Sequence, residues 1–229
     1  TVRLSPREAM QFGRALERLL TKVVHADPRY GPIKFLKIDL SDGFYRIWLR
    51  PGDIEQLGVA LPSLPNEEPL VAFPLVLPMG WTESPPYFCS ATETVADLAN
   101  KRVAQWVNPP VHRLEAAAAT RPSPLPVDTS PLSPPPNTSV AVPLPRTRNP
   151  DILQSKRLLS QIDIFVDDFM AAAQGSPKRL SRIKRILMHA IDDVFRGLDE
   201  RDNVQRKEPI SVKKLLQGDA SWETVKVIL

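Results

Sequence analysis

The sequence predicts an α+β fold in which an antiparallel sheet is backed by helices. Two observations lead to this prediction. Short apolar runs end at acidic turns, as strands and hairpins do, and three other segments begin at Ser-Pro and then carry apolar residues at helical spacing. Of the 229 residues, 42% are hydrophobic and 24% are charged, which is ordinary for a globular protein able to bury a core.

The N-terminal segment predicts a helix from about residue 6 to residue 25. Ser5-Pro6-Arg7-Glu8 has the form of a capping box with proline at the first helical position. Apolar residues at steps of three and four are expected to face the core. They are Ala9, Phe12, Leu16, Leu20 and Val23. A polar face with Arg7, Arg14, Arg18 and Lys22 either approaches a phosphate backbone or faces solvent.

The next segments predict strands. The run from Lys34 ends on Asp39 and enters a turn marked by Gly43. Residues 45–50 alternate as a second strand, and residues 59–61 and 70–73 predict a further pair joined by a polar loop. Together these strands are expected to form a small antiparallel sheet.

The middle of the chain predicts a helix followed by an extended insertion. The helix is expected to start near Ser84 and run through Leu98. Val107 to Pro150 holds 12 of the 25 prolines and no glycine, a composition that favours extended, exposed chain without regular structure. The alternative is a Pro-rich recognition segment that docks into an aromatic groove.

Ile162 to Ala173 predicts a β-hairpin with two adjacent acids, Asp167 and Asp168, at its tip. Adjacent carboxylates repel, and apolar flanks favour their burial, so a hard divalent cation is their natural partner. A solvent-exposed Asp-Asp turn is the alternative. If Asp39 lies on a neighbouring strand, the three acids form a site for two Mg²⁺ ions, roughly 3.5–4 Å apart.

A third Ser-Pro start, at Ser176, predicts the last helix, which ends near Gly197. Five basic residues crowd its first two turns, where they oppose the helix dipole. They are Lys178, Arg179, Arg182, Lys184 and Arg185. A bound phosphate of template or primer would relieve this conflict, and an exposed basic face is the alternative.

Composition limits the remaining function classes. A single cysteine, Cys89, excludes an intramolecular disulfide, and three scattered histidines do not make a zinc cluster. The net charge of +4 is compatible with a polyanionic partner. No apolar run is long enough for a membrane span and the N-terminus lacks the apolar core of a signal peptide, so an intracellular location is expected. The chain starts without Met, which suggests a piece of a longer polyprotein or of a decayed gene.

Three segments resemble, in the right order, motifs A, B and C of reverse transcriptases of LTR-type retrotransposons: residues 34–45, 77–88 and 162–173. The resemblance implies a polymerase palm with partial fingers. It divides the chain into an N-terminal helix of the fingers (1–30), a first palm part (31–106), a Pro-rich flexible insertion (107–150) and a second palm part with a motif D-like region (151–229).

The resemblance implies an RNA-directed DNA polymerase that transfers dNTPs to a primer 3'-hydroxyl on an RNA or DNA template, although the fragment alone is expected to be inactive. Two Mg²⁺ ions, or Mn²⁺, would be held by Asp39, Asp167 and Asp168 as catalytic residues, with Leu40 as a further metal-binding position. The implied substrate-binding residues are Phe44, Met79, Gly80 and Lys214.

Each substrate-binding residue has an implied role. Phe44 would exclude a 2'-hydroxyl, unless it is a core aromatic. Gly80 leaves room for a base pair, and Met79 replaces the Gln of many retroviral enzymes. Lys214, or its neighbour Lys213, would protonate the departing pyrophosphate, unless it is a surface lysine.

The implied partners are a template-primer, a dNTP and the rest of a polyprotein with thumb, ribonuclease H and integrase, and no membrane. The implied location is the cytoplasm or a virus-like particle. Two alternatives stay open: a catalytically incomplete relic that acts at most as a nucleic-acid-binding palm, and another two-metal phosphotransferase such as a cyclase.

Overall fold

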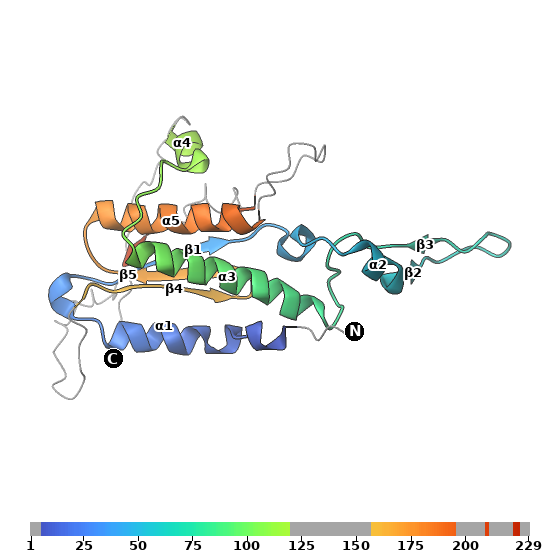
Figure 1. Ribbon diagram of the computed structural model, residues 1–229, viewed down its shortest axis with the longest axis horizontal. Helices are drawn as coiled ribbons and strands as arrows, with labels where there is room; N and C mark the ends of the chain where they lie inside the picture. Colours follow the sequence, from blue (N-terminus) through green and yellow to red (C-terminus); the bar gives the residue numbers. More distant parts are fainter. Residues whose placement is uncertain (1–5, 120–156, 196–208, 211–221, 225–229) are drawn as a thin grey trace, which may run out of the picture.

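A four-stranded antiparallel sheet forms the centre of the protein, which has an α+β architecture (Figure 1). The computed structural model describes residues 6–119, 157–195, 209–210 and 222–224. The strands lie in the order β4 (Ser160–Phe165), β5 (Asp168–Ala173), β1 (Lys34–Asp39) and β6 (Glu223–Thr224). The β4–β5 pair is the hairpin predicted from the sequence, and β1, from far upstream, pairs with β5 along its whole length.

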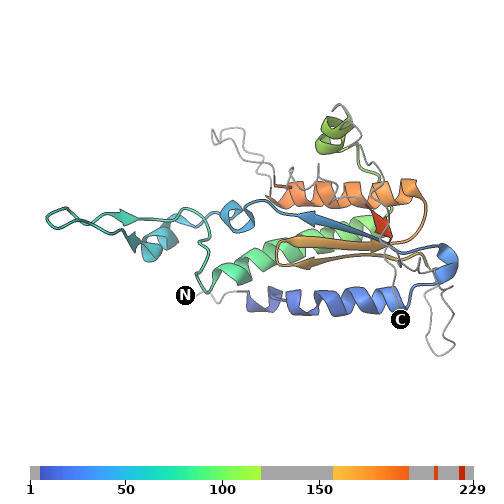
Figure 2. The same ribbon diagram turned by 180° about the vertical axis from the view of Figure 1, so that it is seen from behind.

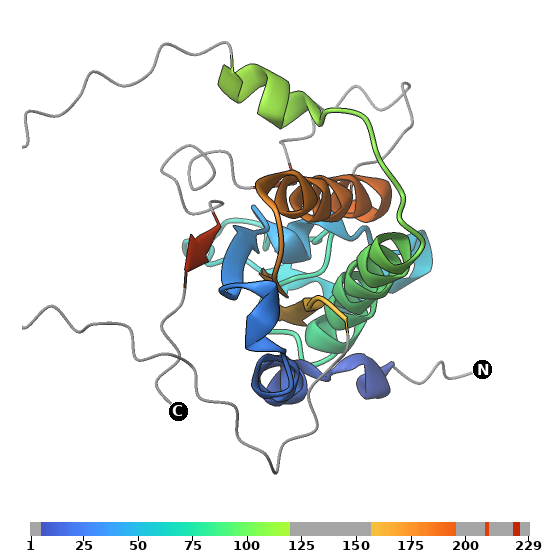
Figure 3. The same ribbon diagram turned by 90° about the vertical axis from the view of Figure 1, so that its left-hand side faces the viewer.

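Helices cover both faces of this sheet (Figure 3). Helices α3 (Ser84–Ala104) and α5 (Pro177–Phe195) lie on one face, and α1 (Ala15–Val24) lies on the other. Strand residues alternate between the faces: Ile38 and Phe169 join the core under α3 and α5, whereas Phe35 and Ala172 pack with α1. The sheet is therefore buried on one face and partly covered on the other.

Strand β4 forms an edge of the sheet, and α3 covers part of it through one side chain. Asn100 donates from Nδ2 to the carbonyl of Ile162 at 2.7 Å and accepts the Ile162 N–H on Oδ1 at 3.0 Å. Both backbone polar groups of Ile162 are thus satisfied by an amide that reproduces the pairing of a neighbouring strand.

The N-terminal helix differs from its prediction in its start and in its buried face. Regular helix begins at Ala15, after two 3₁₀ turns at Arg7–Ala9 and Phe12–Arg14. Gly13 lowers helix propensity there. The buried residues are Ala15, Leu19 and Val23, whereas Leu16 and Leu20 are 59% and 48% exposed. The prediction is confirmed at Val23 and wrong at Leu16 and Leu20. Apolar residues line two adjacent faces, so spacing alone does not select the one that meets the sheet. Ser5, the expected cap, lies outside the described residues.

Residues 51–72, between β1 and α3, form an arm that extends away from the sheet and helices (Figures 1 and 2). The predicted strand at 45–50 is reduced to a single antiparallel bridge between Trp48 and Val76, because Gly43–Arg46 forms a 3₁₀ turn. Pro51–Ile54 then forms the short helix α2. Proline at the first turn of a helix fits its fixed φ. The predicted pair beyond it is confirmed as β2 (Val59–Ala60) and β3 (Val71–Ala72), in a sheet of its own.

The beginning of the Pro-rich insertion is ordered, contrary to its prediction. Residues Arg113–Ala119 form helix α4, whose sequence Arg-Leu-Glu-Ala-Ala-Ala-Ala is rich in strong helix formers and has no proline. Asp192 on α5 accepts a hydrogen bond from Arg113 Nη2 at 2.9 Å and lies 2.9 Å from His112 Nε2. Residues 120–150 lie outside the described part of the chain.

Helix α5 begins at Pro177 as predicted, and its apolar stripe is buried. Three of the basic residues at its start have partners within the chain. Arg179 donates to the Leu159 carbonyl at 3.1 Å, Arg182 lies 4.3 Å from the centre of the Trp106 ring, and Arg185 pairs with Glu115 at 2.7 Å. These contacts hold three of the five basic side chains, and a bound phosphate stays a prediction. The expected end near Gly197 lies outside the described residues.

Candidate metal centre

Strand pairing brings three acidic residues together from distant parts of the sequence. In the β1–β5 register Asp39 lies directly opposite Asp168, and Asp167 precedes Asp168 in the hairpin turn. The N–H of Leu40 donates to the Asp167 carbonyl at 3.1 Å, which joins the end of β1 to that turn.

Asp39, Asp167 and Asp168 each offer one carboxylate oxygen, and these oxygens lie within 4.8 Å of one another. The Asp39 and Asp168 side chains are half-buried, and the Asp167 carboxylate is exposed. The predicted convergence of Asp39 and Asp167 is therefore confirmed, while their binding of a metal stays a prediction. We call these residues the acidic triad.

The acidic triad lies on the face of the sheet that α1 covers only in part. Helix α1 packs near Phe35, Met170 and Ala172 toward one end of that face. The carboxylates lie toward the other end, where β1 and the hairpin finish and solvent reaches them. The site is thus held by backbone pairing and is still accessible to a ligand.

Asp168 carries an incomplete set of partners. Its Oδ2 lies 2.7 Å from Lys37 Nζ, whereas its Oδ1 is buried and has no hydrogen-bond partner. Burial raises the pKa of Asp168; the Lys37 hydrogen bond opposes this, and the contact with Asp39 and the charge of Asp167 raise the pKa further. A cation among these oxygens would satisfy Oδ1 and screen the repulsion, so the residues fit a hard divalent ion.

The turn that holds the two adjacent acids is strained at Val166. This residue has φ 58°, in the left-handed region that β-branched side chains rarely adopt. A positive φ at the first turn residue matches the twist of a two-residue hairpin. Strain of this kind is maintained by the surrounding structure and is concentrated at functional sites.

Phe44 and Gly43 follow the acidic triad's first strand and contact α3. The Phe44 ring is partly buried and stacks on Phe88, with 4.4 Å between the ring centres. A Cβ at Gly43 would lie 2.6 Å from the Phe88 ring, so glycine is required by this close approach. Phe44 therefore packs against the core, and its exclusion of a 2'-hydroxyl stays a prediction.

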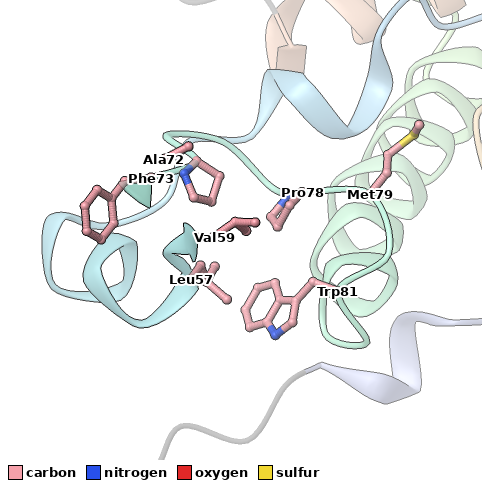
Figure 4. Close-up of a pocket in the computed structure, with 8 residues that line it drawn as sticks. Leu57, Val59, Ala72, Phe73, Pro78, Met79 and Trp81 are labelled. Carbon is pink, nitrogen blue, oxygen red and sulfur yellow. The ribbon is translucent and has the colours of Figure 1, made fainter. Parts of the chain in front are cut away.

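The turn before α3 carries Met79 and Gly80. Gly80 has φ 93°, a conformation that favours glycine, and Ser84 Oγ donates to the Pro78 carbonyl at 2.7 Å, which closes the turn. Met79 is 66% exposed. With the arm it lines an apolar pocket of about 430 Å³ (Figure 4). The lining residues are Leu57, Val59, Ala72, Phe73, Pro74, Pro78, Met79 and Trp81.

Two predicted site residues remain, Leu40 and Lys214. The Leu40 side chain is buried in the core, so only its backbone could serve a metal. Lys214 lies outside the described residues. Sequence reasoning missed Lys37, although its position two residues before Asp39 on a strand places both side chains on one face.

Comparison with protein-family models and with curated proteins finds no match to this chain. In the described parts of the chain, no helix is both long enough and apolar enough to cross a membrane.

Proposed function

We propose that this chain is part of a reverse transcriptase palm that performs two-metal nucleotidyl transfer. The observation that carries the proposal is the convergence of three carboxylates at the ends of paired strands, with one buried oxygen that has no partner. Such a site suits a cation, and its open side suits a large substrate. The order of the three motifs along the chain supports the same function.

In this proposal the carboxylates of Asp39, Asp167 and Asp168 would hold two Mg²⁺ ions. Bound ions would lower the pKa of a primer 3'-hydroxyl and stabilise charge on the departing pyrophosphate. The chain's own contribution is to hold its carboxylates in place through the β1–β5 register and the Leu40–Asp167 hydrogen bond. Fixed geometry of this kind is what makes such electrostatic stabilisation effective.

The residues near the acidic triad would recognise the substrate. Phe44 would limit the space beneath the sugar, and the Met79–Gly80 turn would contact the nascent base pair. Both lie in segments adjoining α3, since Phe44 stacks on Phe88 and Ser84 closes the Met79–Gly80 turn. Lys214 would act on the leaving group.

A primer-extension assay tests the proposal. The chain, extended to include the thumb because the fragment alone is expected to be inactive, is incubated with a DNA primer on an RNA template, dNTPs and Mg²⁺, beside the variants Asp39→Asn and Asp168→Asn. Asp193→Asn is the matched control, because Asp193 is an exposed acid on α5 that pairs with Arg102. We expect extension by the chain and the control, and loss of extension, by roughly a thousandfold or more, in both triad variants.

Two other outcomes are informative. Template-primer binding without extension, unchanged in the triad variants, would favour the catalytically incomplete relic. Activity on a nucleoside triphosphate without any primer, dependent on the acidic triad, would favour the cyclase alternative.

A further inference from the structure

Lys37 places a positive charge directly on the acidic triad. Its Nζ lies 2.7 Å from Asp168 Oδ2, and its side chain is 52% exposed. Lys37 and Asp39 lie on one face of β1, and Asp39 is opposite Asp168. Lys37 is therefore a diagonal neighbour of Asp168, a spacing that a long side chain can bridge.

The Lys37–Asp168 ion pair is weak enough for a metal ion to displace it. Lysine is a point charge on a flexible stem, and an ion pair exposed to this degree contributes little stability. Lys37 also neutralises only one oxygen of Asp168, because Oδ1 has no hydrogen-bond partner. A divalent cation that contacts several carboxylates at once would outcompete a single ammonium group.

We propose that Lys37 is a resident counter-ion of the acidic triad, which occupies Asp168 Oδ2 until a divalent cation displaces it. The inference rests on the proposed function in so far as that function makes the triad a metal site. Lys37 would keep the carboxylates together without metal, and it would lower their affinity for metal.

Metal binding tests this role without any assay of activity. Free Mn²⁺ is measured by electron paramagnetic resonance during titration of the full chain at low ionic strength. Because a unit positive charge a few ångströms away opposes a divalent ion, Lys37→Met should bind Mn²⁺ about tenfold more tightly than the unchanged chain. Lys37→Arg keeps the charge and should stay close to the unchanged chain. Lys178→Met removes an exposed lysine on α5 and should have no effect.

A double-mutant cycle tests the contact in the absence of metal. Lys37→Met should lower the melting temperature of the metal-free chain by a small amount, and it should not do so in an Asp168→Asn background, because the partner charge is already gone. An equal effect in both backgrounds would overturn the counter-ion role.

The remaining outcomes separate the inference from the proposed function. Mn²⁺ binding that depends on Asp39 and is unchanged or weakened by Lys37→Met overturns the counter-ion and leaves the metal site standing. Absence of binding that depends on Asp39 overturns the metal site, and the displacement of Lys37 with it.

Discussion

Two acidic sites on the same face of the sheet differ in how their charges are satisfied. Asp163 on β4 is 2% exposed and accepts hydrogen bonds from Arg18, at 2.8 Å to Nε, and from the Ile164 N–H at 2.9 Å. Asp168, at the start of β5 in the same hairpin, has Lys37 on one carboxylate oxygen and no hydrogen-bond partner on the other. Asp163 is thus a structural carboxylate with rigid, bidentate partners. The acidic triad retains unsatisfied negative charge, which is the property that a cation site requires.

The largest effect is expected at Asp163. Asp163→Ala should lower the free energy of unfolding by about 3 kcal/mol, because it leaves the Arg18 guanidinium without its buried partner. Urea denaturation followed by circular dichroism measures the change. Asp193→Ala, at an exposed acid on α5, is the control and should stay within about 0.5 kcal/mol. An equally small loss at Asp163 would mean that the pair is not structural.

A second structural carboxylate, Asp192, makes the stability of the fold depend on pH. Burial raises the pKa of Asp192, but hydrogen bonds from His112 and Arg113 outweigh burial and lower this pKa from 3.8 to about 2. Its folded pKa lies below its unfolded value, so its contribution is complete above 3.8 and is lost as pH falls toward 2. Asp192→Asn should remove about 1–2 kcal/mol at neutral pH, after allowance for solvent screening, and should flatten this acid limb. The measurement is the free energy of unfolding as a function of pH in the unchanged chain and in the Asp192→Asn variant.

Asp168 should affect the pH dependence of stability in the opposite sense to Asp192. Its pKa is raised, so ionisation of Asp168 destabilises the fold, and acidification toward 3.8 restores stability. As pH falls, the Asp168→Asn variant should therefore lose free energy of unfolding more steeply than the unchanged chain. A shallower loss in the variant would contradict this prediction.

A smaller effect, in this case a gain in stability, is expected from a change at Asp39. Without metal, Asp39→Asn should raise the free energy of unfolding by about 1 kcal/mol, because it removes one of three mutually repelling charges. Differential scanning calorimetry in the presence of a chelator measures this gain. Added Mg²⁺ should then raise the melting temperature of the unchanged chain and not that of the variant. Destabilisation by Asp39→Asn would place Asp39 among the structural carboxylates.

The smallest change is expected at Asp167, the exposed member of the acidic triad. Asp167→Asn should alter the free energy of unfolding by less than about 0.5 kcal/mol, because solvent already screens this carboxylate. Its apparent Mg²⁺ affinity, measured by isothermal titration calorimetry, should nevertheless fall about tenfold. Unchanged Mg²⁺ binding would remove Asp167 from the candidate metal centre.

The sequence predicted the elements whose signals are local. The Asp167–Asp168 hairpin and the Ser-Pro starts of α3 and α5 depend on residues that are close together in the chain. The pairing of β1 with β5 is a long-range feature, and it was expected only because the order of the motifs resembles that of a known family. Once the pairing exists, period-two alternation determines which side chains reach the candidate metal centre.

Other features could not be predicted because tertiary contacts decide them. The buried face of α1 depends on where the sheet lies, since Leu16 and Leu19 are equally apolar. Helix α4 was not predicted, because its short alanine-rich stretch from Arg113 lies in a segment dominated by prolines. Lys37 was missed because a lysine on a strand usually faces solvent, and its partner Asp168 is far away in the sequence.

Asn100 has a consequence for self-association. An uncovered edge strand offers its N–H and C=O groups to any other chain, and edge-to-edge addition of strands is a common route to aggregation. The Asn100 amide already occupies both groups of Ile162 on β4, so a further strand could not continue its ladder past that residue. One amide on α3 therefore opposes the addition of a strand at the edge of the hairpin that carries Asp167 and Asp168.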